Sequence, residues 1–171
     1  MANAKITEIK RIFTSRLDVL DHLLDVAEKH VADTDALMQE RLADDMLPFG
    51  AQIVFMCNQP RGFSQWCAGE PVDNRKPELA TLAEARALIS ETRTMVGAID
   101  VDDSKLDEIK RLGLGPGAFC EIPGHQYVND YLIPNLYFHI TTTYAMLRKM
   151  GMPIGKADYM TFLRPHIQKE A

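Results

Sequence analysis

The sequence has no long apolar run and no block of basic residues. No stretch of 18 or more consecutive apolar residues occurs, which argues against a transmembrane helix. The first residues carry charges every few positions and lack the apolar core and cleavage site of a secretory signal, so we expect a cytoplasmic protein. The formal net charge is −5, and no basic cluster, Lys110-Arg111 included, is longer than two residues. This balance argues against binding of nucleic acid or another polyanion.

Cysteine is also scarce. The chain contains three cysteines, Cys57, Cys67 and Cys120, and no CxxC motif. Cys57 and Cys67 are ten residues apart on one expected helix, which separates them by roughly 15 Å. A disulfide requires Cα atoms within about 7 Å of each other. We therefore expect free thiols, and no cation or histidine could be placed beside one of them to lower its pKa.

The residues that are present predict a helical protein. A chain of 171 residues with 46% hydrophobic residues can form one domain, residues 1–171, with a substantial core. Apolar residues recur every three or four positions from Ile6 to Val31, and further apolar positions widen this stripe. A widened stripe is typical of a helix packed against two neighbours, as in a bundle.

Three further long helices are expected. One covers about residues 46–66, with a bend at Pro60, and one covers 81–99, opened by a capping box of Thr81 and Glu84. The last covers 125–150, with a kink near 131–135 caused by Pro134. A short helix is expected at 35–42, a short extended pair or covering loop at 101–124, and a tail from 152 that returns over the bundle. Together these elements predict an all-α four-helix bundle.

The last of these helices is apolar yet carries several polar side chains. Asn135 and His139 are four residues apart and so share a helix face, and Thr142 follows three residues later. Such groups must be paired or face a cavity, because burying them unpaired costs roughly 1–3 kcal/mol each. His139 is open to three interpretations: a hydrogen-bonded core histidine, a small-molecule contact, or a metal ligand. A metal site needs at least three good ligands, and this helix offers one imidazole and one amide.

Two segments resemble those of a known family. The closing segment YLIPNLYFHITTTYAMLRKMGMPIGKADY and the middle segment LADDMLPFGAQIVFMCNQPRG are similar to motifs of an uncharacterised bacterial domain-of-unknown-function family. That family lies within the DinB/YfiT-like metalloenzyme superfamily, and the resemblance covers nearly the whole chain. It implies an up-down-down-up four-helix bundle, often dimeric, with a pocket between helices.

The resemblance also implies where a metal would be bound. Characterised members of the superfamily bind a divalent metal through three histidines, and some use low-molecular-weight thiols. Their HxxxH pair on the last helix falls on Asn135 and His139 here. Their histidine on the second long helix falls between Gln52 and Gln59, where this chain has none. Two of the three ligands are therefore missing.

Three functions remain open from the sequence. The first is an intracellular binding module whose inter-helix pocket, lined by Gln52, Asn135, His139 and Thr142, holds a small molecule and no cofactor. The second is a metal-dependent enzyme with thiol-transferase-like or hydrolase-like chemistry, in which His139 binds zinc or nickel. The third is a structural protein without a ligand site. In each case we expect a homodimer, formed through an apolar face of the first or last helix.

Overall fold

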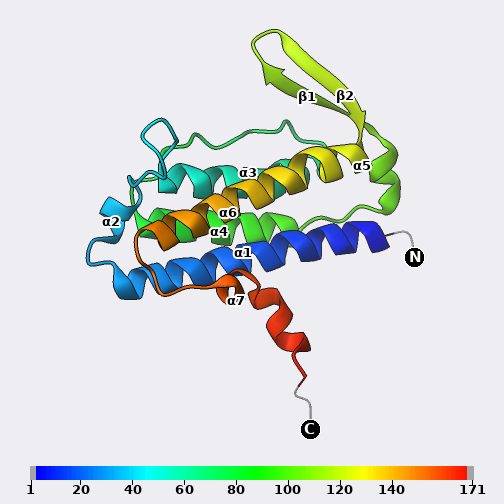
Figure 1. Cartoon of the computed structure of the whole chain (residues 1–171). Helices are drawn as coiled ribbons and strands as arrows, with labels where there is room; N and C mark the ends of the chain where they lie inside the picture. The colour runs from blue at the N-terminus through cyan, green and yellow to red at the C-terminus, as the bar shows by residue number, and fades with distance from the viewer. Residues whose placement is uncertain (1–2, 169–171) are drawn as a thin grey trace.

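The computed structural model describes residues 3–168, and four long helices make up most of it. They are α1 (Ala4–His30), α3 (Phe49–Cys67), α4 (Leu82–Gly97) and α6 (Ile133–Lys149). In Figure 1, α1 runs to the left, α3 and α4 both run to the right, and α6 runs back to the left. This up-down-down-up arrangement confirms the predicted all-α bundle. The expected domain, 1–171, extends at both ends beyond the described residues.

Short helical elements lie between the long helices and after the last one. Those between them are α2 (Thr34–Leu37), η1 (Asp103–Asp107), α5 (Gly124–Gln126) and η2 (Tyr127–Leu132), and those in the tail are α7 (Lys156–Tyr159) and η3 (Thr161–His166). η1 and η3 are 3-10 helices, whereas η2 is π-helical. The connection from α3 to α4 runs back along the length of the bundle (Figure 1), which allows these two consecutive helices to be parallel.

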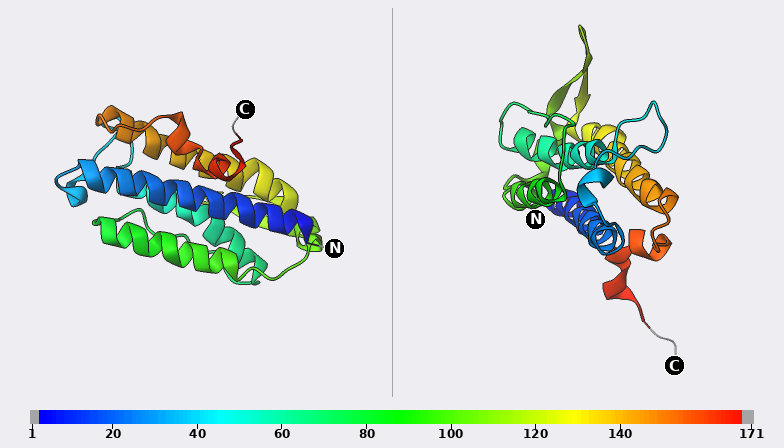
Figure 2. Two further views of the ribbon diagram at one scale, coloured as in Figure 1. Left: turned by 90° about the horizontal axis from the view of Figure 1, so that it is seen from below. Right: turned by 90° about the vertical axis from the view of Figure 1, so that its left-hand side faces the viewer.

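The apolar stripe predicted on the first helix faces the core. Phe13, Leu17, Leu20 and Leu24 are completely buried. α1 lies against both α4 and α6, as the width of its stripe indicated. Figure 2 shows the four helices from below and from one end, with α1 beside α4.

Helix α3 is the most deeply buried element. All but one of its residues are buried, including the polar side chains of Gln52, Asn58 and Gln59. The helix begins at Phe49 and continues through Pro60 to Cys67. It packs against α4 on one side and α6 on the other. Its polar groups must therefore be satisfied by neighbouring elements or face a cavity.

The predicted capping box opens α4. The backbone N–H of Glu84 donates to Thr81 Oγ1 at 3.2 Å, and the backbone N–H of Thr81 donates to Glu84 Oε2 at 3.0 Å. Two otherwise unpaired N–H groups are satisfied in this way, which is worth about 1 kcal/mol.

The irregular region before the last helix forms a β-hairpin, one of the two forms expected for it. β1 (Ile109–Gly115) pairs antiparallel with β2 (Ala118–Pro123). The hairpin stands away from the bundle (Figures 1 and 2). Its last strand leads directly into Gly124, where the backbone is tightly enclosed. A Cβ atom on this residue would lie 2.4 Å from the Trp66 ring and 2.9 Å from Leu106 Cα.

In place of the predicted kink, the last helical segment contains a π-helical turn that begins a few residues nearer the N-terminus. The expected position was 131–135, whereas the irregular hydrogen bonding covers Tyr127–Leu132. The N–H of Ile133 donates to the carbonyl of Val128, five residues earlier. Pro134 explains this shift, because it has no N–H and its ring would collide with the carbonyl of Asp130 in a regular α-helix. The wider turn accommodates proline without a sharp bend.

The described part of the tail packs on α1, as predicted. His22 Nε2 lies 2.8 Å from Asp158 Oδ1, which ties α7 to α1. The Arg16 guanidinium lies 3.7 Å from the centre of the Phe162 ring in η3. No helix within residues 3–168 is both long enough and apolar enough to cross a membrane.

Candidate functional site

A pocket of about 190 Å³ lies between α3 and α6. Val72 of the α3–α4 connection and Leu112 of β1 also line it, as does Gly62 of α3. An added Cβ on Gly62 would lie 3.3 Å from a Val72 methyl and 3.4 Å from the Tyr127 hydroxyl, so a side chain there would crowd the pocket. The polar residues that line the pocket are Asn58, Gln59, Asn74, Tyr127, Tyr131, Asn135 and His139.

Four of these residues follow one another at a spacing of four. Tyr127, Tyr131, Asn135 and His139 all line the pocket, although they extend over three helical turns. In a straight α-helix each step of four residues drifts by about 40° around the axis. The π-helical turn rotates the chain less per residue, so it offsets part of this drift. The turn required by Pro134 thus helps to keep the four side chains on one face.

The imidazole of His139 is oriented by Gln52. Its Nδ1 atom lies 2.9 Å from Gln52 Oε1, and the amide nitrogen of Gln52 donates to the carbonyl of Leu47 at 3.1 Å. Because Gln52 therefore presents its oxygen to the ring, Nδ1 carries the proton and Nε2 is left as an acceptor. Nε2 has no hydrogen-bond partner within residues 3–168.

Burial keeps this imidazole neutral. Desolvation lowers the pKa of His139 to about 4. The ring is also enclosed by aromatic side chains, with the Phe55 and Phe138 ring centres 5.3 and 5.2 Å away. An imidazole with so low a pKa is neutral at pH 7. It can accept a hydrogen bond and act as a weak base, but it cannot act as a general acid.

The side-chain amides of Asn135 and Gln59 line the same pocket as His139. Asn135 donates through its side-chain nitrogen to the carbonyl of Tyr131 at 2.7 Å, and Gln59 donates in the same way to the carbonyl of Phe55 at 2.8 Å. These bonds leave the two side-chain oxygens without partners among the described residues. Asn58 differs, because it pairs at both ends with the backbone of Arg75 and so fixes the loop that covers the pocket.

Two tyrosines form the remaining wall. The rings of Tyr127 and Tyr131 are stacked with centres 5.9 Å apart, and Trp66 packs edge-on against Tyr127 at 5.6 Å. Burial raises the pKa of Tyr127, so its hydroxyl stays protonated. Neither tyrosine hydroxyl has a partner within residues 3–168, and both residues line the pocket.

The structure brings three of the four predicted site residues together. Asn135 and His139 line the pocket, and Gln52 supports His139 from behind. Thr142 lies outside the lining and donates to the carbonyl of Phe138 at 2.8 Å. Its hydroxyl is therefore satisfied by its own helix.

Gln59, Tyr127 and Tyr131 line the pocket but were not among the predicted site residues. The series of polar and aromatic residues at a spacing of four, ending at His139, was the signal that could have identified the two tyrosines. Gln59 lies on the second long helix, but nothing in the sequence indicated which turn of that helix faces His139.

Comparison with known proteins identifies a family for this chain and a solved structure with a similar fold. Residues 8–160 match the model of a family described as "Domain of unknown function (DUF1993)". The chain belongs to the DUF1993 family. This DUF1993 protein is also similar to a crystal structure of a DinB family member protein from Shewanella denitrificans, with 28% identity and a TM-score of 0.75. The alignment covers 88% of each chain, and the fold is DinB-like. No curated protein matches the sequence.

The donor set of the DUF1993 pocket does not fit a zinc or nickel ion. At the three positions that the family resemblance assigns to histidines, this chain has His139, Asn135 and a residue of α3, where Gln59 lines the pocket. Zinc and nickel sites are built from imidazole, thiolate and carboxylate ligands, whereas neutral amide oxygens are poor ligands for these ions. Within residues 3–168 no cluster of three or more His, Cys, Asp or Glu side chains could hold a metal ion.

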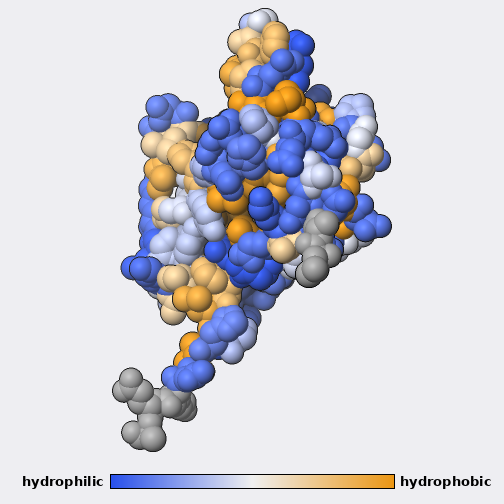
Figure 3. Space-filling view, turned by 90° about the vertical axis from the view of Figure 1, so that its right-hand side faces the viewer, coloured by the Kyte–Doolittle hydropathy of each residue, from blue (hydrophilic) through white to orange (hydrophobic). Residues whose placement is uncertain are grey.

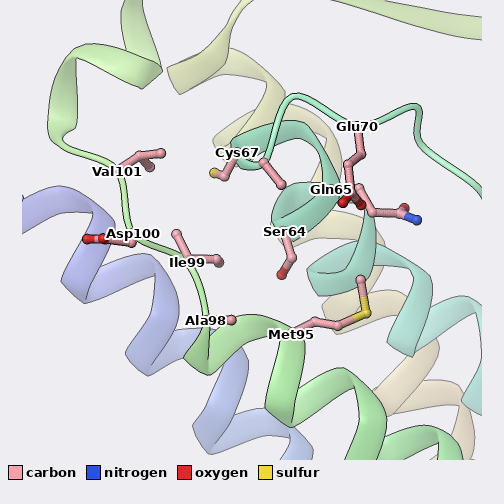
Figure 4. Close-up of a pocket in the computed structure, with 10 residues that line it drawn as sticks. Ser64, Gln65, Cys67, Glu70, Met95, Ala98, Ile99, Asp100 and Val101 are labelled. Carbon is pink, nitrogen blue, oxygen red and sulfur yellow. The ribbon is translucent and has the colours of Figure 1, made fainter.

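A second cavity in this DUF1993 protein, of about 280 Å³, lies between the ends of α3 and α4 (Figure 4). Two of its polar side chains are bonded within the protein, and its two carboxylates, Glu70 and Asp100, are exposed to solvent. Ser64 donates to the carbonyl of Pro60, and Gln65 Oε1 accepts from the backbone of Asp73. Burial raises the pKa of the Cys67 thiol to about 11, so it is not a nucleophile at neutral pH. This cavity therefore offers less chemistry than the His139 pocket.

Proposed function

We propose that this protein binds a small, uncharged, polar molecule in the pocket between α3 and α6. One observation carries the proposal: several polar atoms that have no hydrogen-bond partner among residues 3–168 face the same partly open pocket. They are His139 Nε2, the side-chain oxygens of Asn135 and Gln59, and the hydroxyls of Tyr127 and Tyr131. Gln59 and Tyr127 are buried and Tyr131, Asn135 and His139 are half-buried, so these atoms remain accessible from the pocket and favour a hydrogen-bonding ligand that enters it.

The pocket selects for a neutral molecule. Its lining contains no lysine, arginine, aspartate or glutamate, and His139 is uncharged above a pH of about 4. A charged ligand would lose its hydration without gaining an opposite charge, which is costly in a buried site. Lys110 lies outside, 5.6 Å from the centre of the Tyr127 ring, and would further disfavour a cation.

The arrangement of donors and acceptors defines the chemistry further. His139 Nε2 and the two amide oxygens can only accept hydrogen bonds, whereas the tyrosine hydroxyls can donate. The preferred ligand therefore carries at least one N–H or O–H group and one acceptor, as an amide or an alcohol does.

Size restricts the ligand to a small fragment. A volume of 190 Å³ corresponds to about six water molecules at roughly 30 Å³ each. Pockets for drug-sized ligands are larger, at about 300–1,000 Å³.

Acetamide, acetate and acetamidinium test the proposal, because they have the same shape and differ in charge. We expect acetamide, titrated at millimolar concentrations, to shift the NMR signals of His139 and Asn135 in a saturable manner. Acetate and acetamidinium should cause no saturable shift. The His139→Phe variant should weaken acetamide binding at least tenfold, whereas His125→Phe, which changes an exposed histidine, should not.

Two results would contradict the proposal. One is the absence of saturable acetamide shifts at the pocket. The other is binding of the charged isosteres with the same affinity, which would show that the pocket does not select for neutral molecules.

A further inference from the structure

Two walls of the His139 pocket are not helical. Val72 and Asn74 belong to the connection between α3 and α4, and Leu112 belongs to β1. The remaining lining residues lie on α3, η2 and α6, whose apolar side chains are packed into the core. Helices packed in this way open at a higher free energy than surface segments do. The width of the pocket's opening therefore depends on the connection and on the hairpin.

A larger groove at the end of the bundle does not lead to this pocket. The groove has a volume of about 560 Å³ and an apolar floor that includes Ile9, Ile12 and Val128. Figure 3 views this end of the molecule and shows hydrophobic side chains at the centre of the face, surrounded by hydrophilic ones. Among residues 3–168, none lines both the groove and the pocket. Access to His139 is therefore decided at the side of the bundle.

The α3–α4 connection has no hydrogen-bonded backbone structure of its own. From residue 71 to residue 79, no backbone N–H or carbonyl bonds to another backbone group of the described chain. β1, in contrast, is hydrogen-bonded to β2 from Ile109 to Gly115. Segments without backbone hydrogen bonds open more readily than helices and strands. The connection is therefore the wall of the pocket that is displaced most easily.

Two buried amide side chains of α3 bind the main chain of the connection. Asn58 donates to the carbonyl of Arg75 at 3.1 Å and accepts from the backbone N–H of Arg75 at 3.0 Å. Gln65 Oε1 accepts from the backbone N–H of Asp73 at 3.2 Å. These three bonds hold Val72, the neighbour of Asp73, in the wall of the pocket.

An ion pair with Glu91 of α4 fastens the same stretch. Nη2 of Arg75 lies 2.9 Å from both carboxylate oxygens of Glu91. Oε1 of Glu91 also accepts from Nη1 of Arg61 at 2.8 Å, and this α3 side chain is only 6% exposed. Glu91 is thus fixed to the bundle by Arg61. The Arg75 and Glu91 side chains are 51% and 44% exposed, and ion pairs of this kind are weak and screened by salt.

We infer that residues 72–75 form a gate of the His139 pocket, held closed by the ion pair between Arg75 and Glu91. Opening of the gate withdraws Val72 and Asn74 from the pocket and lets water replace the bonds of the Asn58 amide. The inference rests on the binding proposed for this pocket, because it states where the bound molecule enters and leaves. Since an ion pair holds the gate closed, higher ionic strength favours the open form.

Hydrogen exchange of the backbone N–H groups of residues 73 and 75 tests the gate directly. In the Arg75→Gln variant, the protection factors of both groups should fall by about two- to fivefold, because one exposed ion pair is lost. The matched control is Lys76→Gln, which removes the same charge from the next residue. Lys76 is exposed and forms no ion pair within residues 3–168, so its substitution should leave both protection factors unchanged. Urea unfolding verifies that the two variants are equally stable.

Ionic strength provides a second test on the same groups. Raising the salt concentration from about 0.01 M to about 1 M shortens the Debye length from about 30 Å to about 3 Å. The protection factors should fall with salt in the wild type and in Lys76→Gln. In Arg75→Gln, which lacks the ion pair, they should not change with salt.

Chemical modification of His139 measures access to the pocket without any bound molecule. Diethyl pyrocarbonate reacts with neutral imidazoles, and mass spectrometry distinguishes His139 from the exposed His30, which serves as the internal reference. The rate at His139 relative to His30 should rise by about two- to fivefold in Arg75→Gln. In Lys76→Gln it should equal that of the wild type.

The inference requires both effects, so equal values for the two variants in either measurement would overturn it. Binding of acetamide together with equal rates would refute the gate alone. If the rates differed as expected and acetamide did not bind, the proposed ligand would be wrong, whereas control of access by residues 72–75 would be supported.

Discussion

The Nδ1 atom of His139 lies 2.9 Å from the side-chain oxygen of Gln52, although the two residues are 87 positions apart. This contact fixes the tautomer of the imidazole and leaves Nε2 available to the pocket. We expect nitrogen NMR of the labelled protein to show the Nδ1–H tautomer at pH 7, with a pKa of about 4. Gln52→Glu should raise the pKa of His139, because a carboxylate favours the imidazolium.

Gln52→Leu provides the matched control for this substitution. It removes the acceptor without adding charge, so the tautomer preference should be lost and the pKa of His139 should not rise. If Gln52→Glu left the pKa unchanged, the contact between the two side chains would not exist in solution.

The low pKa of His139 predicts a specific pH dependence of stability. In the unfolded chain this histidine takes up a proton near pH 6.5, whereas in the folded chain it does so near pH 4. The unfolded state therefore binds more protons between these values. The contribution of His139 to the free energy of unfolding should be constant above about pH 6.5, fall as the pH decreases to about 4, and level off below that.

Urea unfolding of the wild type and the His139→Phe variant, at several pH values, measures this contribution. Other titrating groups, including the Asp158 carboxyl, are common to both proteins and cancel in the difference. The variant should lose less stability than the wild type between pH 6.5 and pH 4.5. Parallel curves for the two proteins would show that His139 titrates alike in the folded and unfolded states.

The sequence predicted the bundle well because its signals are local. The stripe beginning at Ile6 and the capping box at Thr81 depend on residues within a few turns of each other, and both appear as expected. The same holds for Asn135 and His139, whose spacing places them on one helix face. Hydrophobic periodicity and helix capping were therefore sufficient to predict the long helices of the bundle.

The remainder of the site depends on contacts between distant parts of the chain. Thr142 shared the expected face with His139, but its hydroxyl bonds to its own helix, which sequence spacing alone does not reveal. Leu112 and Val72 reach the pocket from the hairpin and from the α3–α4 connection. The position of the π-helical turn also decides which tyrosines face inward, and a proline predicts an irregularity without fixing its form.

The donor set of the pocket predicts weak binding of transition metals. Protein purified without a histidine tag should contain well below one equivalent of zinc or nickel by elemental analysis, because Gln59 and Asn135 offer only neutral amide oxygens. Stoichiometric metal that is lost in the His139→Ala variant would instead support the metalloenzyme alternative.

A converse experiment tests whether these three side chains converge. The double substitution Gln59→His and Asn135→His should create a zinc site of micromolar or tighter affinity, since three imidazoles would face one space. Adding His139→Ala to the double variant should weaken zinc binding by at least tenfold. Calorimetric titration with zinc distinguishes the two variants, and failure of the double variant to bind would place the side chains too far apart.

Gly124 joins the hairpin to the last helical segment and predicts a marked loss of stability on substitution. A Cβ atom at this position would lie 2.4 Å from the Trp66 ring, and 2.9 and 3.0 Å from the backbone of Leu106. Because the backbone of Leu106 cannot yield as a flexible side chain would, Gly124→Ala should lower the free energy of unfolding by about 1–3 kcal/mol. Gly97→Ala is the matched control, since a Cβ atom there meets nothing within 4 Å. Alanine also has the higher helix propensity, so this control should be neutral or up to about 1 kcal/mol more stable. Equal stabilities of the two variants in urea unfolding would show that η1 and the root of the hairpin are not packed together as described.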